Sequence, residues 1–192
     1  MALQSPTRRD DIDQRYLPCV SPQMQTLAAS LARVAATEAP VLICGETGSG
    51  KSTLARQVYE DSPRRGLPLL VLHSAAATAE AVDGLLGLGE QTVLLEEIGE
   101  LAPSVQDSLV RVLSGVRARG GLRLITTTSG DLTALTRRHG MRADLLYRLD
   151  VVRLEIPPLR HRSEDIIFLA EHFLMLAARR FRRDVRAFSP DA

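Results

Sequence analysis

Short runs of consecutive apolar residues alternate along this chain with stretches in which apolar side chains recur every three or four positions. The short runs predict five strands, at residues 39–44, 67–72, 92–95, 122–126 and 151–156. The periodic stretches predict helices, and the clearest of these begin near Pro22, Thr53, Pro103 and Ser163. Apolar residues fill the strands instead of alternating with polar ones, so helices should cover both faces of a parallel sheet. The expected fold class is α/β.

The pair Pro157-Pro158 follows the last predicted strand and indicates a boundary. Residues 1–20 are polar and mixed in charge, and we expect an N-terminal extension there. Residues 21–157 hold the alternating strands and helices and should form the α/β domain. Residues 158–192 contain a helix that Ser163 is expected to cap, and they should form the start of a second, smaller helical unit that is incomplete.

Composition narrows the function classes. With 192 residues, 45% hydrophobic side chains and no long apolar run, the chain should be soluble, bury a full core and lack a membrane segment. No signal segment is recognisable, so we expect a cytoplasmic location. Two cysteines, Cys19 and Cys44, do not make a disulfide framework, and Cys44 is expected to be a small buried residue without a metal or redox role.

The charge of the chain gives little support to nucleic-acid binding, because the formal net charge is only +1. A cluster of arginines nevertheless follows the last predicted helix, at Arg179, Arg180, Arg182, Arg183 and Arg186. Two interpretations stay open, a nucleic-acid contact or a solvated helix end whose positive charges interact favourably with the helix dipole. No module that reads nucleic acid is visible, so any DNA targeting would rest on other sequence or on a partner.

Residues 45–52, GETGSGKS, fit the phosphate-loop pattern G-x-x-x-x-G-K-[ST] between a predicted strand and a predicted helix. Glycines let the backbone turn its amides inward, and the helix N-terminus adds partial positive charge where phosphates would lie. Lys51, the only lysine of the chain, should reach the β- and γ-phosphates, and the Ser52 hydroxyl should bind Mg²⁺. The candidate nucleotide-binding residues are Gly45, Glu46, Thr47, Gly48, Ser49, Gly50, Lys51, Ser52 and Thr53.

Paired carboxylates, Glu96 and Glu97, follow the predicted strand 92–95. Acids at strand ends are common and are often only solvated, but near a phosphate loop they have a specific use. Glu96 is therefore a candidate ligand of Mg²⁺, and Glu97 a candidate for orienting a water on the γ-phosphate.

These motifs resemble the AAA+ domain of bacterial enhancer-binding proteins, the sigma-54-dependent transcription activators, from about Pro22 onward. Four segments carry the resemblance: GETGSGKS at 45–52, LLEEIGEL at 94–101, MRADLLYRL at 141–149 and IPPLRHRSEDI at 156–166. The resemblance implies an AAA+ P-loop NTPase that binds ATP or ADP with Mg²⁺, assembles into a hexamer-like ring and carries a small helical lid after Pro158.

The same resemblance implies that Arg142 and Arg148 reach into the nucleotide site of a neighbouring subunit. A fixed guanidinium supplied from outside would offset charge on the transferring phosphoryl group. The simpler alternative is that each arginine forms a surface salt bridge, with Asp144 or Asp150 as partner.

Four departures from the family's pattern affect the expected function. The family's G-A-F-T-G-A loop, which grips the sigma factor, has no counterpart between the phosphate-loop helix and Glu96, where Gly84–Gly89 should form a short flexible connection. Glu96 itself replaces an aspartate. His73 replaces an asparagine that senses the catalytic glutamate; it either keeps that role or is a plain strand-end histidine. Ser129 replaces an asparagine near the γ-phosphate and is kept as a candidate catalytic residue.

Two functions follow. The first is a ring-forming ATPase that regulates transcription, without a direct contact to sigma-54. The second is a nucleotide-binding module with little hydrolysis that acts on a partner, such as a related AAA+ regulator.

Overall fold

The computed structural model describes residues 20–189, apart from residues 88, 120, 132, 133, 135, 138, 139, 184 and 186. The expectations for the N-terminal extension up to Cys19, for Arg186 and for the last three residues lie outside the described part.

Five parallel strands form one sheet in the order β2-β3-β4-β1-β5. Their bounds are β1 Val41–Cys44, β2 Leu69–His73, β3 Gln91–Glu96, β4 Leu122–Thr128 and β5 Val152–Glu155. The predicted strands and their parallel arrangement are confirmed. β2 begins two residues later than predicted, after Pro68, which has no amide hydrogen to donate to a neighbouring strand.

The main helices are α1 Pro22–Ala35, α2 Lys51–Glu60, α3 Ala79–Asp83, α4 Pro103–Arg119, α6 Ala143–Leu149 and α7 Glu164–Phe181. Short 3₁₀ turns lie at η2 Ser74–Ala76, η3 Gly84–Gly87, η4 Ile98–Glu100 and η5 Leu159–His161. Helices α3 and α6 have five and seven residues, too few for a helical repeat to stand out in the sequence. The connection expected at Gly84–Gly89 is largely a 3₁₀ turn, because Leu85 packs into the core with 5% of its surface exposed.

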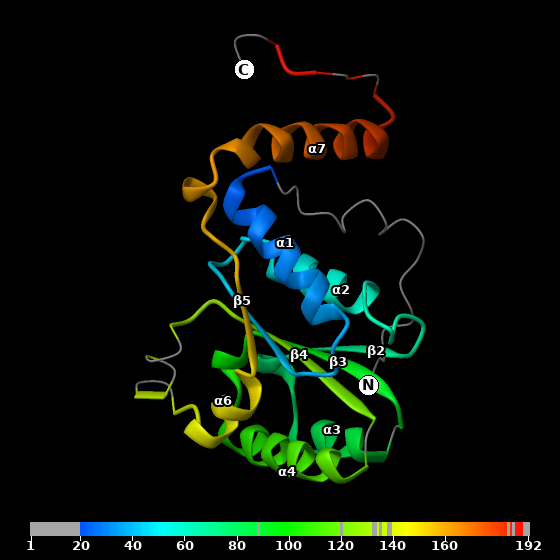
Figure 1. Ribbon diagram of the computed structural model, residues 1–192, viewed down its shortest axis with the longest axis vertical. Helices are drawn as coiled ribbons and strands as arrows, with labels where there is room; N and C mark the ends of the chain where they lie inside the picture. Colours follow the sequence, from blue (N-terminus) through cyan, green and yellow to red (C-terminus); the bar gives the residue numbers. More distant parts are fainter. Residues whose placement is uncertain are drawn as a thin grey trace.

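Helices cover both faces of the sheet, as predicted. Figure 1 shows α1 and α2 on one face and α3, α4 and α6 on the other. Strand β1 contributes to both cores, since Val41 and Ile43 pack with α1 and α2, while Leu42 packs with the opposite layer. The sheet is therefore the middle layer of three, and its carboxyl edge lies between the two helical layers.

Helix α7 stands at one end of the molecule, beyond α1 and away from the sheet (Figure 1). The prediction that Ser163 caps it is wrong, because Ser163 has helical backbone angles and its side chain forms no capping hydrogen bond. Asp165, fully buried, instead accepts hydrogen bonds from the Val20 and Ser21 amides at 2.8 and 2.9 Å and from the Ser21 hydroxyl at 2.7 Å. Asp165, in the first turn of α7, thus ties this helix to the start of α1.

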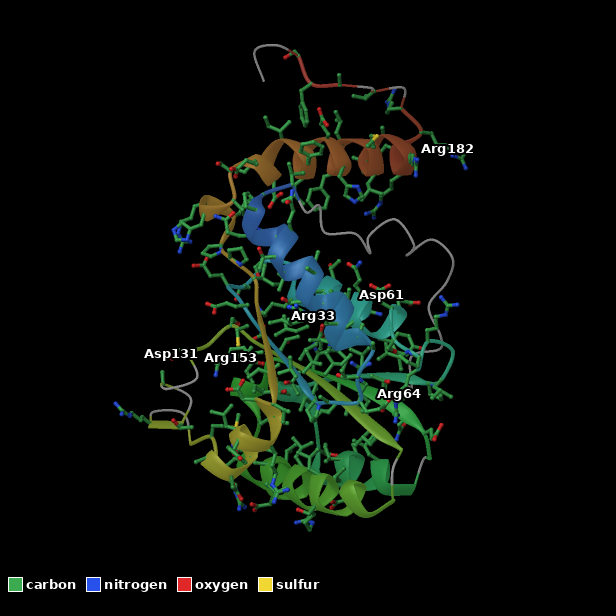
Figure 2. All side chains as sticks on the ribbon, viewed as in Figure 1. Arg33, Asp61, Arg64, Asp131, Arg153 and Arg182 are labelled. Atoms are coloured by element: carbon green, nitrogen blue, oxygen red, sulfur yellow. The ribbon has the colours of Figure 1, made fainter. Side chains whose placement is uncertain are left out.

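The C-terminal end of α7 is solvated. Arg182, labelled in Figure 2, ends the helix in the left-handed conformation, and its amide donates to the Ala178 and Arg179 carbonyls. The described arginines of the cluster are all exposed, in keeping with a solvated helix end. Among the helices of the described residues, none has the length and apolar character needed to cross a bilayer.

Candidate functional site

The phosphate loop connects β1 to α2 at the carboxyl edge of the sheet. Gly48 and Gly50 have φ angles of 80° and 105°, which strongly favour glycine. Gly45 is required for another reason, since a Cβ there would lie 2.7 Å from the Ser49 hydroxyl and 3.2 Å from the Ile156 Cβ. No side chain caps α2, so its first amides are open to a ligand.

Lys51 begins α2, directly after the loop, and is 6% exposed. Its ammonium donates to the Gly45 carbonyl at 3.0 Å and the Glu46 carbonyl at 3.1 Å. The same Nζ atom lies 3.0 Å from Oε1 of Glu97. The predicted phosphate-binding cation and the predicted catalytic carboxylate are therefore in direct contact.

Ser49 gives an independent indication that the loop fits a phosphate group. Its hydroxyl is buried, and among the described residues it has no hydrogen-bond partner. A buried hydroxyl without a partner is costly, and a phosphate oxygen could accept from it. Ser52 is exposed in the first turn of α2 and Thr53 is half-buried beside it, so both can reach a ligand in the loop. The residues present fit a nucleotide phosphate.

Glu97 is held in an unusual conformation. Its φ and ψ of 56° and 63° are left-handed, and its amide donates to the Thr127 hydroxyl at 3.1 Å. Its Oε2 atom accepts from the Ser129 amide at 2.9 Å and the Ser129 hydroxyl at 2.6 Å. Burial alone would raise the pKa of Glu97, but the hydrogen bonds from Ser129 and Lys51 hold it below its ordinary value. Glu97 is thus ionised at neutral pH.

His73 contacts the first carboxylate instead of the second. Its Nδ1 atom lies 3.0 Å from Oε2 of Glu96, and the parallel register of β2 and β3 explains this, because it pairs His73 with Glu96. The interpretation of His73 as a partner of Glu97 is therefore wrong in this structure. Ser129 forms that contact, because β4 lies between β3 and β1 and so ends beside both Glu97 and the phosphate loop.

Arg142 and Arg148 lie at opposite ends of α6. Arg142 is exposed and forms ion pairs with Asp107, on α4, and with Asp144 at 2.8 Å. Arg148 is half-buried in the last turn. Within the described part of the chain, neither arginine forms a hydrogen bond or ion pair with the phosphate loop of its own chain.

The salt-bridge alternative therefore holds for one of the two proposed pairs. Arg142 pairs with Asp144, and Arg142 in turn holds the pKa of that carboxyl below its usual range. Asp150 pairs with Arg153 instead of Arg148. Arg153, labelled in Figure 2, lies on β5, so the sheet supplies the partner of Asp150.

Two residues of the site were not predicted from the sequence. Arg160 donates two hydrogen bonds to Glu46, at 2.8 and 2.9 Å, and Arg162 donates to the Ser49 carbonyl at 2.9 Å. The segment 156–166 had been singled out only for its family resemblance. The sequence shows only that both arginines closely follow a predicted strand; the pairing of that strand with β1, which brings them to the phosphate loop, is set by the tertiary structure.

Cys44 ends β1 and is half-buried. Burial raises its pKa to about 11, so it remains a thiol at neutral pH. Cys44 packs against the core that contains Leu42, but it is less buried than predicted.

A sequence profile described as "Sigma-54 interaction domain" matches residues 19–159. This chain belongs to that family. The curated relative ZraR, a transcriptional regulatory protein of Escherichia coli K12, is 37% identical over 201 aligned residues, which cover 90% of this chain and 46% of the relative. Sigma-54 interaction domains of this kind thus occur in transcription regulators, and the chain spans about half the length of the curated relatives it matches.

Solved structures agree with the family. NtrX from Brucella abortus in complex with ADP superimposes with a TM-score of 0.81 at 27% identity, covering 94% of this chain and 48% of that one. The P-loop NTPase domain of an E. coli sigma-54 activator superimposes with a TM-score of 0.56 at 18% identity, over 71% of this chain and 95% of that one, which bears on the fold alone. The sigma-54 interaction domain described here has the AAA+ P-loop fold.

Proposed function

We propose that this sigma-54 interaction domain binds ATP and ADP at residues 45–53 and uses the nucleotide to regulate transcription. The convergence of Lys51, Glu97 and Ser129 carries the proposal. Lys51 begins α2, Glu97 follows β3 and Ser129 follows β4, yet contacts of 3.0 Å or less join the three side chains at the phosphate loop. Binding of ADP by the homologous NtrX supports it. Residues 21–157 would form the nucleotide-binding domain, and residues 158–192 the start of a helical lid.

The proposed metal is Mg²⁺, held by Ser52 and Glu96. Mg²⁺ usually binds one or two protein oxygens together with substrate phosphates and waters, so a cage of many protein ligands is not needed. Bound there, the ion would offset the charge of the phosphates. His73 keeps Glu96 in place, and the Glu96 carboxylate is nearly buried, with 9% of the side chain exposed.

Hydrolysis would depend on Glu97. The low pKa keeps the carboxylate ionised, so that it can accept a hydrogen bond from a water and orient that water for attack. Oε2 already accepts two hydrogen bonds from Ser129, so the water would be accepted at Oε1, which contacts only Lys51 among the described residues. Ser129 is proposed as a catalytic residue that holds the Glu97 carboxylate in this orientation.

Assembly into a ring would bring further positive charge to the nucleotide. We propose that Arg142 and Arg148 act on the nucleotide of a neighbouring copy in a ring, and the exposure of Arg142 supports this role. Tyr147 lies between the two arginines and is 83% exposed. Aromatic residues are enriched at subunit contacts, and such a residue would be exposed when the chain is considered alone. The pairs of Arg142 with Asp107 and Asp144 would have to open or reorient on assembly.

A direct sigma-54 contact is not part of the proposal. The chain between β2 and β3 is taken up by η2, α3 and η3, whose Val82 and Leu85 are buried, and this leaves little chain to protrude. The alignment with ZraR spans 201 residues, more than the 192 of this chain, so the relative carries residues that this chain lacks. DNA binding would depend on other sequence or on a partner. The proposed location of the protein is the cytoplasm.

One observation favours the alternative function, a nucleotide-binding module with little turnover. Both carboxylates are already engaged, Glu96 by His73 and Glu97 by Lys51 and Ser129, and Glu96 is one methylene longer than the usual aspartate. Such a module would act by binding a partner, such as a related AAA+ regulator.

Thermal denaturation tests the nucleotide site, which both functions need. The melting temperature should rise with the concentration of Mg-ATP or ADP, because a ligand that binds only the folded state stabilises it. Lys51→Ala should abolish most of the rise, whereas Arg33→Ala, on the exposed side of α1, should keep it. No rise for the unmodified protein at millimolar Mg-ATP would refute nucleotide binding.

A further inference from the structure

The turn η5, with the residue after it, holds the phosphate loop at two points. Arg160 grips the Glu46 carboxylate with both terminal nitrogens, at 2.8 and 2.9 Å. Arg162, only 2% exposed, donates to the Ser49 carbonyl at 2.9 Å. Each contact joins residues more than a hundred positions apart, separated by 114 and 113 residues respectively. Neither contact belongs to the phosphate-loop pattern itself.

The Arg162 contact has a direct consequence for the loop. In a trans peptide the carbonyl of one residue and the amide hydrogen of the next point in opposite directions. Because the Ser49 carbonyl is directed at Arg162, the amide hydrogen of Gly50 is directed away from that arginine. Gly50 has a φ of 105°, so its peptide could readily rotate without an external anchor.

The arginines are themselves well anchored. Asp165, at the start of α7, accepts three hydrogen bonds from Val20 and Ser21 and thereby fastens the segment after η5 to α1. On the other side, the Ile156 amide donates to the Cys44 carbonyl at 2.8 Å, which extends the pairing of β5 with β1. One end of the segment is fixed to the start of α1 and the other to β1, the strand that leads into the loop, so its two guanidinium groups are preorganised.

We propose that Arg160 and Arg162 are positioning residues that shape the phosphate loop for nucleotide phosphates. Arg162 orients the Gly50 amide, and Arg160 fixes the Glu46 end of the loop. This inference rests on the proposed nucleotide binding. If the two arginines only stabilised the fold, their loss would lower the melting temperature without a specific loss of ADP affinity.

The decisive comparison is between two buried arginines. Arg123 is 1% exposed and donates to the Val34 and Ala35 carbonyls at 3.0 and 3.1 Å. It lies at the amino end of β4, at the edge of the parallel sheet opposite the loop. Arg162→Met should weaken ADP binding about tenfold, the scale of one hydrogen bond from a charged group. Arg123→Met should lower the melting temperature of the nucleotide-free protein and leave the ADP dissociation constant within about twofold. Arg162→Lys, which keeps a donor and the charge, should recover part of the loss.

The exposed ion pair of Arg160 with Glu46 gives a second measurement, which tests the positioning role even if Arg162→Met does not fold. Arg160→Gln should weaken ADP binding by about threefold, the scale of a surface ion pair, whereas Arg111→Gln, which breaks the similarly exposed pair with Asp83, should have no effect. In a Glu46→Gln background Arg160→Gln should add nothing further, because its partner is already lost.

Calorimetric titration with ADP separates the possible failures. If the unmodified protein binds ADP and both Arg160→Gln and every folded Arg162 variant bind it equally well, the positioning role is overturned while nucleotide binding stands. If the unmodified protein does not bind ADP at millimolar concentration, the proposed function fails and this inference fails with it.

Discussion

Replacing Ser129 by alanine should destabilise the protein at neutral pH but not in acid. Ser129→Ala removes the 2.6 Å hydrogen bond from the hydroxyl to Oε2 of Glu97 and leaves the bond from the backbone amide. Hydrogen bonds to charged groups contribute about 1.5–3 kcal/mol, and we expect about 1 kcal/mol here because the Glu97 side chain is 33% exposed. The free energy of unfolding at pH 7 should fall by that amount.

The dependence on pH follows from the direction of the pKa shift. The pKa of Glu97 is lowered in the folded protein relative to its ordinary 4.5, so the stability it contributes is present above 4.5 and is lost as pH falls through the folded value. Without the hydroxyl the folded pKa rises, which brings it nearer the unfolded one. The difference between Ser129→Ala and the unmodified protein should therefore shrink in acid.

Urea denaturation between pH 7 and pH 3 measures this difference. Ser114→Ala is a matched control, because the Ser114 hydroxyl donates at 2.7 Å to an uncharged partner, the Val110 carbonyl. Its effect should not change with pH. If the two serine variants gave parallel curves across the pH range, the Glu97 contact would contribute nothing through its charge and the reasoning would be refuted.

Two further predictions concern assembly and the sigma factor. Phosphate release should rise faster than linearly with protein concentration and fall on the order of a thousandfold in Arg142→Ala, the usual scale for an arginine supplied by a neighbouring subunit. Turnover proportional to protein concentration and indifferent to Arg142 and Arg148 would contradict that role. The chain should not be captured by sigma-54 in the presence of ADP and aluminium fluoride, since its sequence contains no G-A-F-T-G-A motif. Stable capture in that pull-down would restore a direct contact.

The contacts of the Glu97 carboxylate matter for both the stability and the hydrolysis experiments. Lys51 and Ser129 together occupy both carboxylate oxygens, and the left-handed backbone at Glu97 is held by Thr127. A non-glycine residue in that region costs about 1–3 kcal/mol, which the surrounding hydrogen bonds offset. Loading of the site would compete for Lys51 first, because phosphate oxygens would replace a carboxylate as its partner.

The sequence by itself determined the local structure of this protein. Apolar runs and helical repeats are properties of neighbouring residues, so the five strands and the helices α1, α2, α4 and α7 could be predicted with their approximate bounds. The phosphate-loop pattern was equally accessible, because its glycines, Lys51 and Ser52 all lie within residues 45–52 and the pattern depends only on their spacing along the chain. Glu96 and Glu97 were found because they end an apolar strand.

Only the tertiary structure decided which of these residues meet. Strand order places β4 between β3 and β1 and so brings Ser129 to Glu97, while the register of β2 on β3 brings His73 to Glu96. The contact of Arg162 with Ser49 depends likewise on β5 lying beside β1. Such contacts join residues tens to more than a hundred positions apart, and they result from packing the whole sheet between its helices, which no local pattern specifies.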